Sequence, residues 1–148
     1  MASAIRDTIL AIGTGVVVTL AWWLSHFPAP HMATAILPSM ATTTCIWLSM
    51  PALKTWRVVA SHVAGATIAA ATWFLLPDKH LALMIGVSIV AVITITGLRH
   101  APAVATAAAC ALHPDKMPQL AMAISIQLAV ITLAVQVLRK IDHKKLPE

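Results

Sequence analysis

Two apolar stretches of the sequence contain a proline followed by small and hydroxyl-bearing residues. Residues 38–42 and 102–106 both fit the pattern Pro-x-x-Ala-Thr. Because proline lacks an N–H donor and clashes with the preceding turn, we expect Pro38 and Pro102 each to end one half-helix and begin another. The free N–H groups and positive dipole at the start of a half-helix favour an anion. Hydroxyl donors would come from Ser39, Thr42, Thr43 and Thr106.

From the sequence alone, these residues could instead have a purely structural role. Prolines inside membrane helices are tolerated as kinks, and Ser, Thr and Ala let helices approach closely. For a single threonine this explanation is the better one. For the two segments together, with histidines nearby, we expect a binding site.

Two histidines lie close to these segments. His62 falls five residues into an apolar stretch, where an ionisable group is expensive and is a functional candidate by default. It would donate to an anion or carry a proton coupled to the anion, unless it only bonds a neighbouring carbonyl. His100 follows Arg99, where a contact to a lipid headgroup or phosphate is the alternative to ligand binding. The predicted substrate-binding residues are Pro38, Ser39, Thr42, Thr43, His62, His100, Pro102 and Thr106.

The apolar stretches contain no acidic residue. This argues against a cation or proton pump built on Asp or Glu relays and against carboxylate catalysis. No hydrolase, metalloprotease or phosphate-binding motif is present, so we expect no enzyme, no metal and no cofactor.

Cys45 and Cys110 lie in apolar segments, where a thiol acts as a small hydrophobe. The basic residues are scattered, unlike the contiguous stripe that nucleic acid requires.

The composition indicates a membrane protein. Of the 148 residues, 59% are apolar and only 10% are charged, and the mean hydropathy is +0.87. Soluble domains carry about a quarter charged residues. Apolar runs of this length, without two-residue alternation, predict membrane-spanning helices. The fold class predicted is therefore all-α, a polytopic bundle with six spans at residues 8–26, 31–50, 57–76, 81–98, 101–113 and 117–138.

The fifth predicted span is short, and the basic residues decide whether it crosses. If it crosses, both termini are cytoplasmic, and only Lys79 and Lys116 lie outside. This distribution is the one that the positive-inside rule prefers. The basic residues then inside are Arg6, Lys54, Arg57, Arg99, Arg139, Lys140, Lys144 and Lys145. If the segment instead dips in and returns, the last span must end on the far side with its four basic residues.

Six spans divide into two sets of three, and the second set is then inverted relative to the first, as in many secondary transporters. We expect a single transmembrane domain over residues 1–148, with inverted repeats at 1–77 and 78–140 and a broken second helix in each. A basic cytoplasmic tail at 139–148 would contact anionic lipid. The location expected is the inner membrane of a bacterial cell.

Three stretches of the sequence resemble the HPP family of small integral membrane proteins. They are Pro38–Ala41, Pro51–Val58 with the Ser61–His62 pair, and His100–Ala107, which is similar to the His-Pro-Pro-Ala-Gly-Ala-Thr-Ala motif that names the family. The sequence departs from the family pattern at several positions: Ala101, Val104, Lys54–Trp56 and Ser61. The resemblance implies transport of nitrite, because plastid and cyanobacterial members are associated with it.

The sequence therefore predicts transport of a small inorganic anion, with nitrite as the candidate, at a midplane site formed by half-helix N-termini. One protomer of 15.7 kDa is small for enclosing a pathway, so we expect a homo-oligomer in the bilayer. The alternative is a structural or accessory subunit of a larger membrane complex.

Overall fold

The computed structural model describes residues 2–50 and 53–144, and every regular element in this part of the chain is helical. The all-α prediction is confirmed. Pro51 and Ala52, and residues 145–148 of the predicted basic tail, lie outside the described residues. The elements are α1 (Ala2–His26), α2 (Pro30–Ala35), α3 (Leu37–Ser49), α4 (Thr55–Leu75), α5 (Lys79–Ile93), the π-helical turn η1 (Thr94–Leu98), α6 (Ala103–Leu112), the short 3-10 turn η2 (Pro114–Lys116) and α7 (Met117–Lys144).

The helices fall where the apolar stretches of the sequence place them. The second stretch is broken, as Pro38 leads one to expect, but the break is at Ile36, between α2 and α3. Pro38 then lies in the first turn of α3, where its missing N–H has no helical partner to lose. The break is slight, because Met40 N–H still donates to the Ile36 carbonyl at 3.1 Å.

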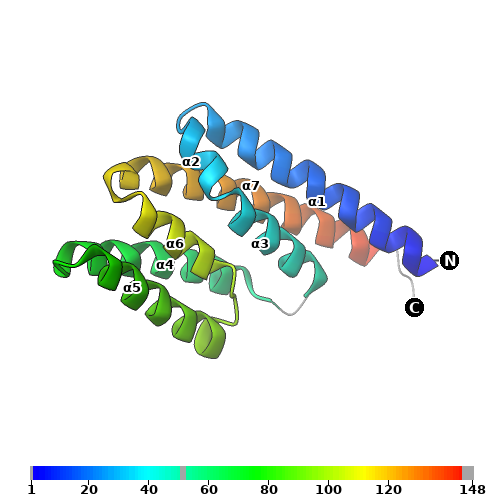
Figure 1. Cartoon of the computed structure of the whole chain (residues 1–148). Helices are drawn as coiled ribbons and strands as arrows, with labels where there is room; N and C mark the ends of the chain where they lie inside the picture. Colours follow the sequence, from blue (N-terminus) through cyan, green and yellow to red (C-terminus); the bar gives the residue numbers. More distant parts are fainter. Residues whose placement is uncertain (1, 51–52, 145–148) are drawn as a thin grey trace.

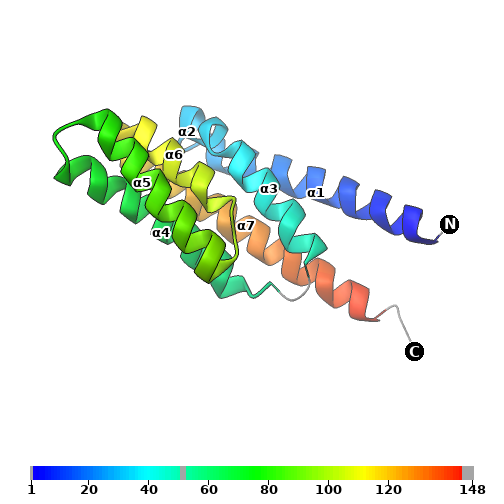
Figure 2. The same cartoon turned by 60° about the horizontal axis from the view of Figure 1, so that its bottom comes forward.

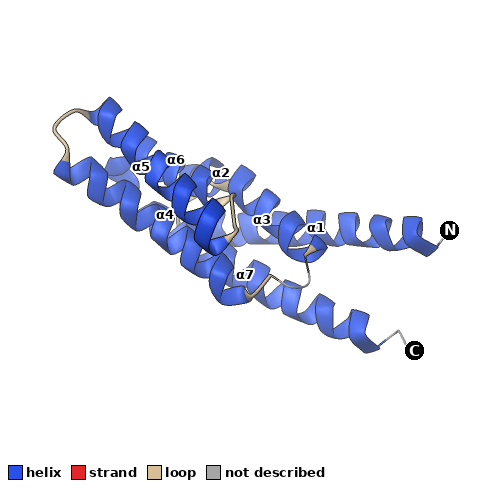
Figure 3. Cartoon of the chain, turned by 90° about the horizontal axis from the view of Figure 1, so that it is seen from below, coloured by secondary structure: helices blue, strands red, loops and turns tan. Residues whose placement is uncertain are grey.

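Successive long helices run in alternating directions, so that the start of α1 and the end of α7 lie at the same end of the bundle (Figures 1 and 2). Helix α1 packs against α3 and α7, and α5 packs against α6 and α4 (Figure 3). Helix α3 also contacts α6, which brings the two proline-containing segments together.

The outer surface of the bundle carries many large apolar side chains, as its interior does. Trp47, Ile36 and Met40 are fully buried, whereas Phe74 and Leu75 are 76% and 80% exposed. Such a surface is unfavourable in water and suits a bilayer. Three helical segments, Thr55–Leu75, Lys79–Leu98 and Pro114–Lys140, are long and apolar enough to cross a membrane, which indicates a membrane location. Two shorter apolar segments are Ala11–His26 and Ala103–Leu112.

Two local features hold α6 close to α4. A Cβ atom added at Gly65 of α4 would lie 2.9 Å from the Ala103 carbonyl oxygen, so only glycine permits this approach without a shift. Before α6, the chain turns at Arg99, which has a left-handed φ of 55°. The His100 N–H then donates to the Thr94 carbonyl at 2.9 Å and closes the turn. Together these features fix His100 and the start of α6 beside α4.

Candidate functional site

Five polar side chains meet inside the apolar bundle, and we call them the histidine–hydroxyl cluster. They come from α3, α4, the turn before α6, and α6 itself. Four are 0% exposed, and Ser39 is 2% exposed. Polar groups buried in this way are retained only when they are hydrogen-bonded, and each of the five makes such bonds. The members are Ser39, Thr43, His62, His100 and Thr106.

One side of the cluster is a chain of hydroxyl contacts between α3, α6 and α4. The Ser39 hydroxyl donates to the Pro102 carbonyl at 2.7 Å. The Ser39 and Thr106 hydroxyl oxygens are 2.8 Å apart. Thr106 Oγ1 is also 2.8 Å from His62 Nδ1. The Nδ1 edge of His62 is therefore tied to α3 through two hydroxyls.

The other side of the cluster is a triangle of three atoms, Thr43 Oγ1, His62 Nε2 and His100 Nε2. Thr43 Oγ1 lies 2.9 Å from His62 Nε2 and 3.2 Å from His100 Nε2. The two Nε2 atoms are 3.2 Å apart, and the rings meet edge to face. Thr43 also donates to the Ser39 carbonyl at 2.8 Å. Three groups that each can donate or accept are thus in mutual contact.

One atom of the cluster lacks a partner. His100 Nδ1 is buried and makes no hydrogen bond within the described residues. A buried nitrogen without a partner costs free energy, so it is the atom most in need of a further group. Among the described residues, no group of three or more His, Cys, Asp or Glu side chains is arranged to hold a metal ion.

The backbone N–H groups at the start of α6 are already hydrogen-bonded within the chain and are not free to bind a ligand. At the start of α6, the N–H groups of Ala103, Val104 and Ala105 donate to carbonyls three residues earlier, at 3.4, 3.0 and 3.1 Å. They are therefore occupied within the turn. Ser39 lies in the first turn of α3 and Thr106 in the first turn of α6, so both hydroxyls are near the positive end of their own helix, which favours negative charge there.

Three of the substrate-binding residues predicted from the sequence do not contribute a side chain to the histidine–hydroxyl cluster. Thr42 is on the exposed side of α3, and its hydroxyl donates to the Pro38 and Ser39 carbonyls at 2.8 and 3.0 Å. Pro38 is exposed as well. Pro102 is buried and takes part through its carbonyl oxygen, which accepts from Ser39.

A second buried polar contact was not predicted from the sequence. Gln127 of α7 is 0% exposed and donates to Ser25 Oγ at 2.8 Å and to the Ala33 carbonyl at 3.2 Å. It joins α7 to α1 and α2. The sequence signal was available, because an amide in the middle of an apolar span must find a partner.

A comparison with known protein families, curated proteins and solved structures finds no match to this chain.

Proposed function

We propose that this chain transports a small inorganic anion across a membrane, with the histidine–hydroxyl cluster as its binding site. The observation that carries the proposal is the burial of two histidines and three hydroxyls inside a bundle whose surface is apolar. Ionisable groups at such positions are expensive and mark substrate pathways. A purely structural core would be cheaper to build from apolar side chains.

The charge of the site selects an anion. No Asp or Glu occurs among the apolar segments, so these segments supply no carboxylate for a cation. The cluster offers imidazoles and hydroxyls, which can donate hydrogen bonds, and two of its members lie in the first turns of α3 and α6, near the positive ends of these helices. Nitrite, which the HPP resemblance implies, is small enough to be held by a few such donors.

The helix arrangement supports six crossings in two inverted sets of three. The packing of α1 against α3 and α7 corresponds to that of α5 against α6 and α4. The two middle helices, α3 and α6, then contact each other, at the repeat interface where inverted-repeat transporters bind their substrate. Only the first of them is broken, because α6 is continuous from Ala103 to Leu112. We place both termini in the cytoplasm of a bacterial cell, and we expect a homo-oligomer.

The experiment is nitrite uptake into proteoliposomes containing the purified protein. Thr106→Val removes a hydroxyl that bridges Ser39 and His62. Ser125→Ala is the matched control, because the Ser125 hydroxyl is exposed and bonds only the Ala121 carbonyl of its own helix. We expect the wild type and Ser125→Ala to take up nitrite and Thr106→Val to be impaired. Absence of uptake by the wild type, with nitrite and other small anions, contradicts the proposal.

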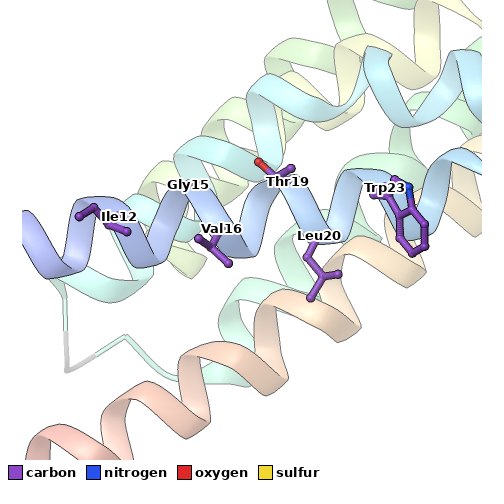
Figure 4. A pocket seen from close by; sticks show the side chains of 6 residues that line it. All are labelled: Ile12, Gly15, Val16, Thr19, Leu20 and Trp23. Carbon is purple, nitrogen blue, oxygen red and sulfur yellow. The ribbon is translucent and has the colours of Figure 1, made fainter.

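A second candidate function is that of an accessory subunit, and the outer face of α1 favours it. A shallow groove runs along this helix and is lined by residues of α1 alone (Figure 4). Gly15 is one of the lining residues, and an added Cβ there would meet nothing within 4 Å. The face is thus open to a partner helix or to lipid. Co-purification of a partner protein that is lost in Gly15→Leu would favour this function. The lining residues are Ile12, Gly15, Val16, Thr19, Leu20 and Trp23.

A further inference from the structure

The hydrogen atoms of the cluster can be assigned from its acceptors. Ser39 has one hydroxyl hydrogen, and it goes to the Pro102 carbonyl, which cannot donate. In the contact between the two hydroxyls, Thr106 must therefore donate to Ser39. Thr106 then has no hydrogen left for His62, so His62 Nδ1 must donate to Thr106. His62 keeps its proton on Nδ1, and only its Nε2 is free to gain or lose one.

The group that faces His62 Nε2 is the Thr43 hydroxyl, at 2.9 Å. Thr43 has one hydrogen and two acceptors within reach, because the Ser39 carbonyl lies at 2.8 Å. The Ser39 carbonyl does not depend on the Thr43 hydroxyl, because it lies inside α3, where carbonyls accept from backbone N–H groups. Rotation of one hydroxyl therefore switches Thr43 between donating to His62 and accepting from it.

We propose that Thr43 is the switch that lets His62 bind and release one proton in place, and that each transported anion crosses with one proton. When His62 is neutral, Thr43 donates to its Nε2. When His62 is charged, Thr43 donates to the Ser39 carbonyl, and its oxygen accepts from Nε2. Both protonation states of His62 are thus fully hydrogen-bonded without movement of a helix. This inference rests on the proposed anion transport and names its coupling ion.

No acidic side chain hydrogen-bonds to His62 in the described residues, so a positive charge on its ring must be balanced by the substrate. Its ring faces Thr43 of α3, Thr106 of α6 and His100, and of these only His100 titrates. No charged side chain of α5 or α7 hydrogen-bonds to the ring in the described part of the chain. A buried imidazolium without a carboxylate is unstable unless an anion accompanies it. Proton and anion therefore stabilise each other in the site and cross as a neutral pair.

His100 is the member of the cluster that still has a free hydrogen-bonding atom within the described residues. In the neutral state its Nε2–H donates to Thr43 Oγ1, which lies 3.2 Å away. When His62 is charged, Thr43 Oγ1 can accept from both Nε2 atoms, because a hydroxyl oxygen has two lone pairs. His100 Nδ1 stays buried without a partner in the described residues, so it is the position in the cluster where an incoming polar group can bond.

The test measures nitrite and protons together in proteoliposomes that contain a trapped pH dye, with the membrane potential clamped by potassium and valinomycin. Empty liposomes correct for leakage of nitrous acid. We expect one proton to enter per nitrite, and the rate to respond to the pH gradient but not to the sign of the potential. Nitrite uptake driven by an inside-positive potential without acidification overturns the inference while leaving anion transport intact. Absence of nitrite uptake overturns both.

The variants isolate the switch. Thr43→Val removes the hydroxyl, and we expect proton-coupled uptake to fall by about tenfold or more, since a hydrogen bond to a charged group is lost. Thr43→Ser restores the hydroxyl and the coupling. Thr44→Val is the matched control, because Thr44 is the next residue, is equally buried and donates only to the Met40 carbonyl at 2.8 Å. Equal loss in Thr43→Val and Thr44→Val contradicts a role specific to Thr43. The proton count of the wild type decides the coupling even if a variant does not fold, and the comparison of Thr43→Ser with Thr43→Val decides the role of Thr43.

Discussion

The hydroxyls of Ser39 and Thr106 lie 2.8 Å apart although 67 residues separate them in the chain. Ser39 belongs to the first Pro-x-x-Ala-Thr segment and Thr106 to the second. The two copies of the pattern are therefore not only similar in sequence but in direct contact, at the junction of α3 and α6. This contact ties the cluster to the packing of the bundle.

A double-mutant cycle measures how strongly this contact holds α3 to α6. We expect Ser39→Ala and Thr106→Val each to destabilise the protein by about 1–3 kcal/mol, because each leaves a buried partner unsatisfied. Their coupling energy should be about 0.5–2 kcal/mol, the range for hydrogen bonds within membranes. Unfolding in mixed micelles of increasing denaturing detergent gives these free energies. Strictly additive effects would show that the two hydroxyls do not interact.

The close approach of α4 to α6 at Gly65 makes a second prediction. In Gly65→Ala the new Cβ would lie 2.9 Å from the Ala103 carbonyl oxygen, so one helix must shift. We expect a loss of about 1–3 kcal/mol, as for other overpacked cores, and impaired uptake, because His62 lies one turn away. Gly15→Ala is the matched control, since an added Cβ there meets nothing within 4 Å. Its effect on the free energy of unfolding should be neutral or stabilising. The prediction is wrong if the two variants have the same thermal stability.

The sequence predicts the helices well because apolar length and proline position are local signals. It also names all five members of the histidine–hydroxyl cluster, since a polar residue inside an apolar run must find a partner. The sequence does not show that Thr43 is buried in the cluster while Thr42 is exposed. The rotation of α3 about its axis decides this, and it is set by packing against α6. The sequence places the helix break at Pro38, whereas in the structure the break is at Ile36, the N-cap residue of α3. Pro38 lies in the first turn of α3, where a proline is tolerated.

The contact of Gln127 with Ser25 depends on tertiary structure in the same way. The two residues are 102 positions apart, and nothing in the sequence pairs them. Polarity inside an apolar span indicates that a partner exists but not which helix supplies it. The side of a helix and the identity of a partner are set by the fold as a whole.

The turn between α4 and α5 makes a prediction about acid stability. Asp78 caps α5, and its Oδ1 accepts from the His80 and Leu81 N–H groups at 2.9 and 3.1 Å. The Leu81 N–H is the main cause that holds the pKa of Asp78 below its ordinary value of 3.8, followed by His80. Because the pKa is lower in the folded state, the stabilisation is present above the ordinary pKa and is lost as the pH falls through the folded value.

The measurement is the melting temperature between about pH 5 and pH 2. Asparagine caps a helix about as well as aspartate and has no proton to gain. We therefore expect the melting temperature of Asp78→Asn to fall less over this range than that of the wild type, while Asp78→Ala is lower at every pH. Parallel curves for the wild type and Asp78→Asn would show that the cap does not contribute to acid unfolding.

The last prediction concerns the crossing of α6, on which the inverted arrangement depends. Helix α6 has 10 residues and rises only about 15 Å, about half of the hydrocarbon thickness. If the segment nevertheless crosses, residues before and after it lie on opposite sides of the membrane. Gly97 and Asp115 are suitable exposed positions on either side, and an added Cβ at Gly97 meets nothing within 4 Å.

Single cysteines at these positions, in a Cys45→Ala, Cys110→Ala background, report their side by reaction with a membrane-impermeant maleimide. His80→Cys and Lys54→Cys mark the two sides, because Lys54 directly precedes α4 and His80 lies in the first turn of α5, just beyond the other end of α4. We expect Asp115→Cys to react together with His80→Cys in intact cells, and Gly97→Cys to react with Lys54→Cys only in inverted vesicles. Reaction of Gly97→Cys and Asp115→Cys from the same side would make α6 re-entrant, leave five crossings and remove the two-fold relation between the halves.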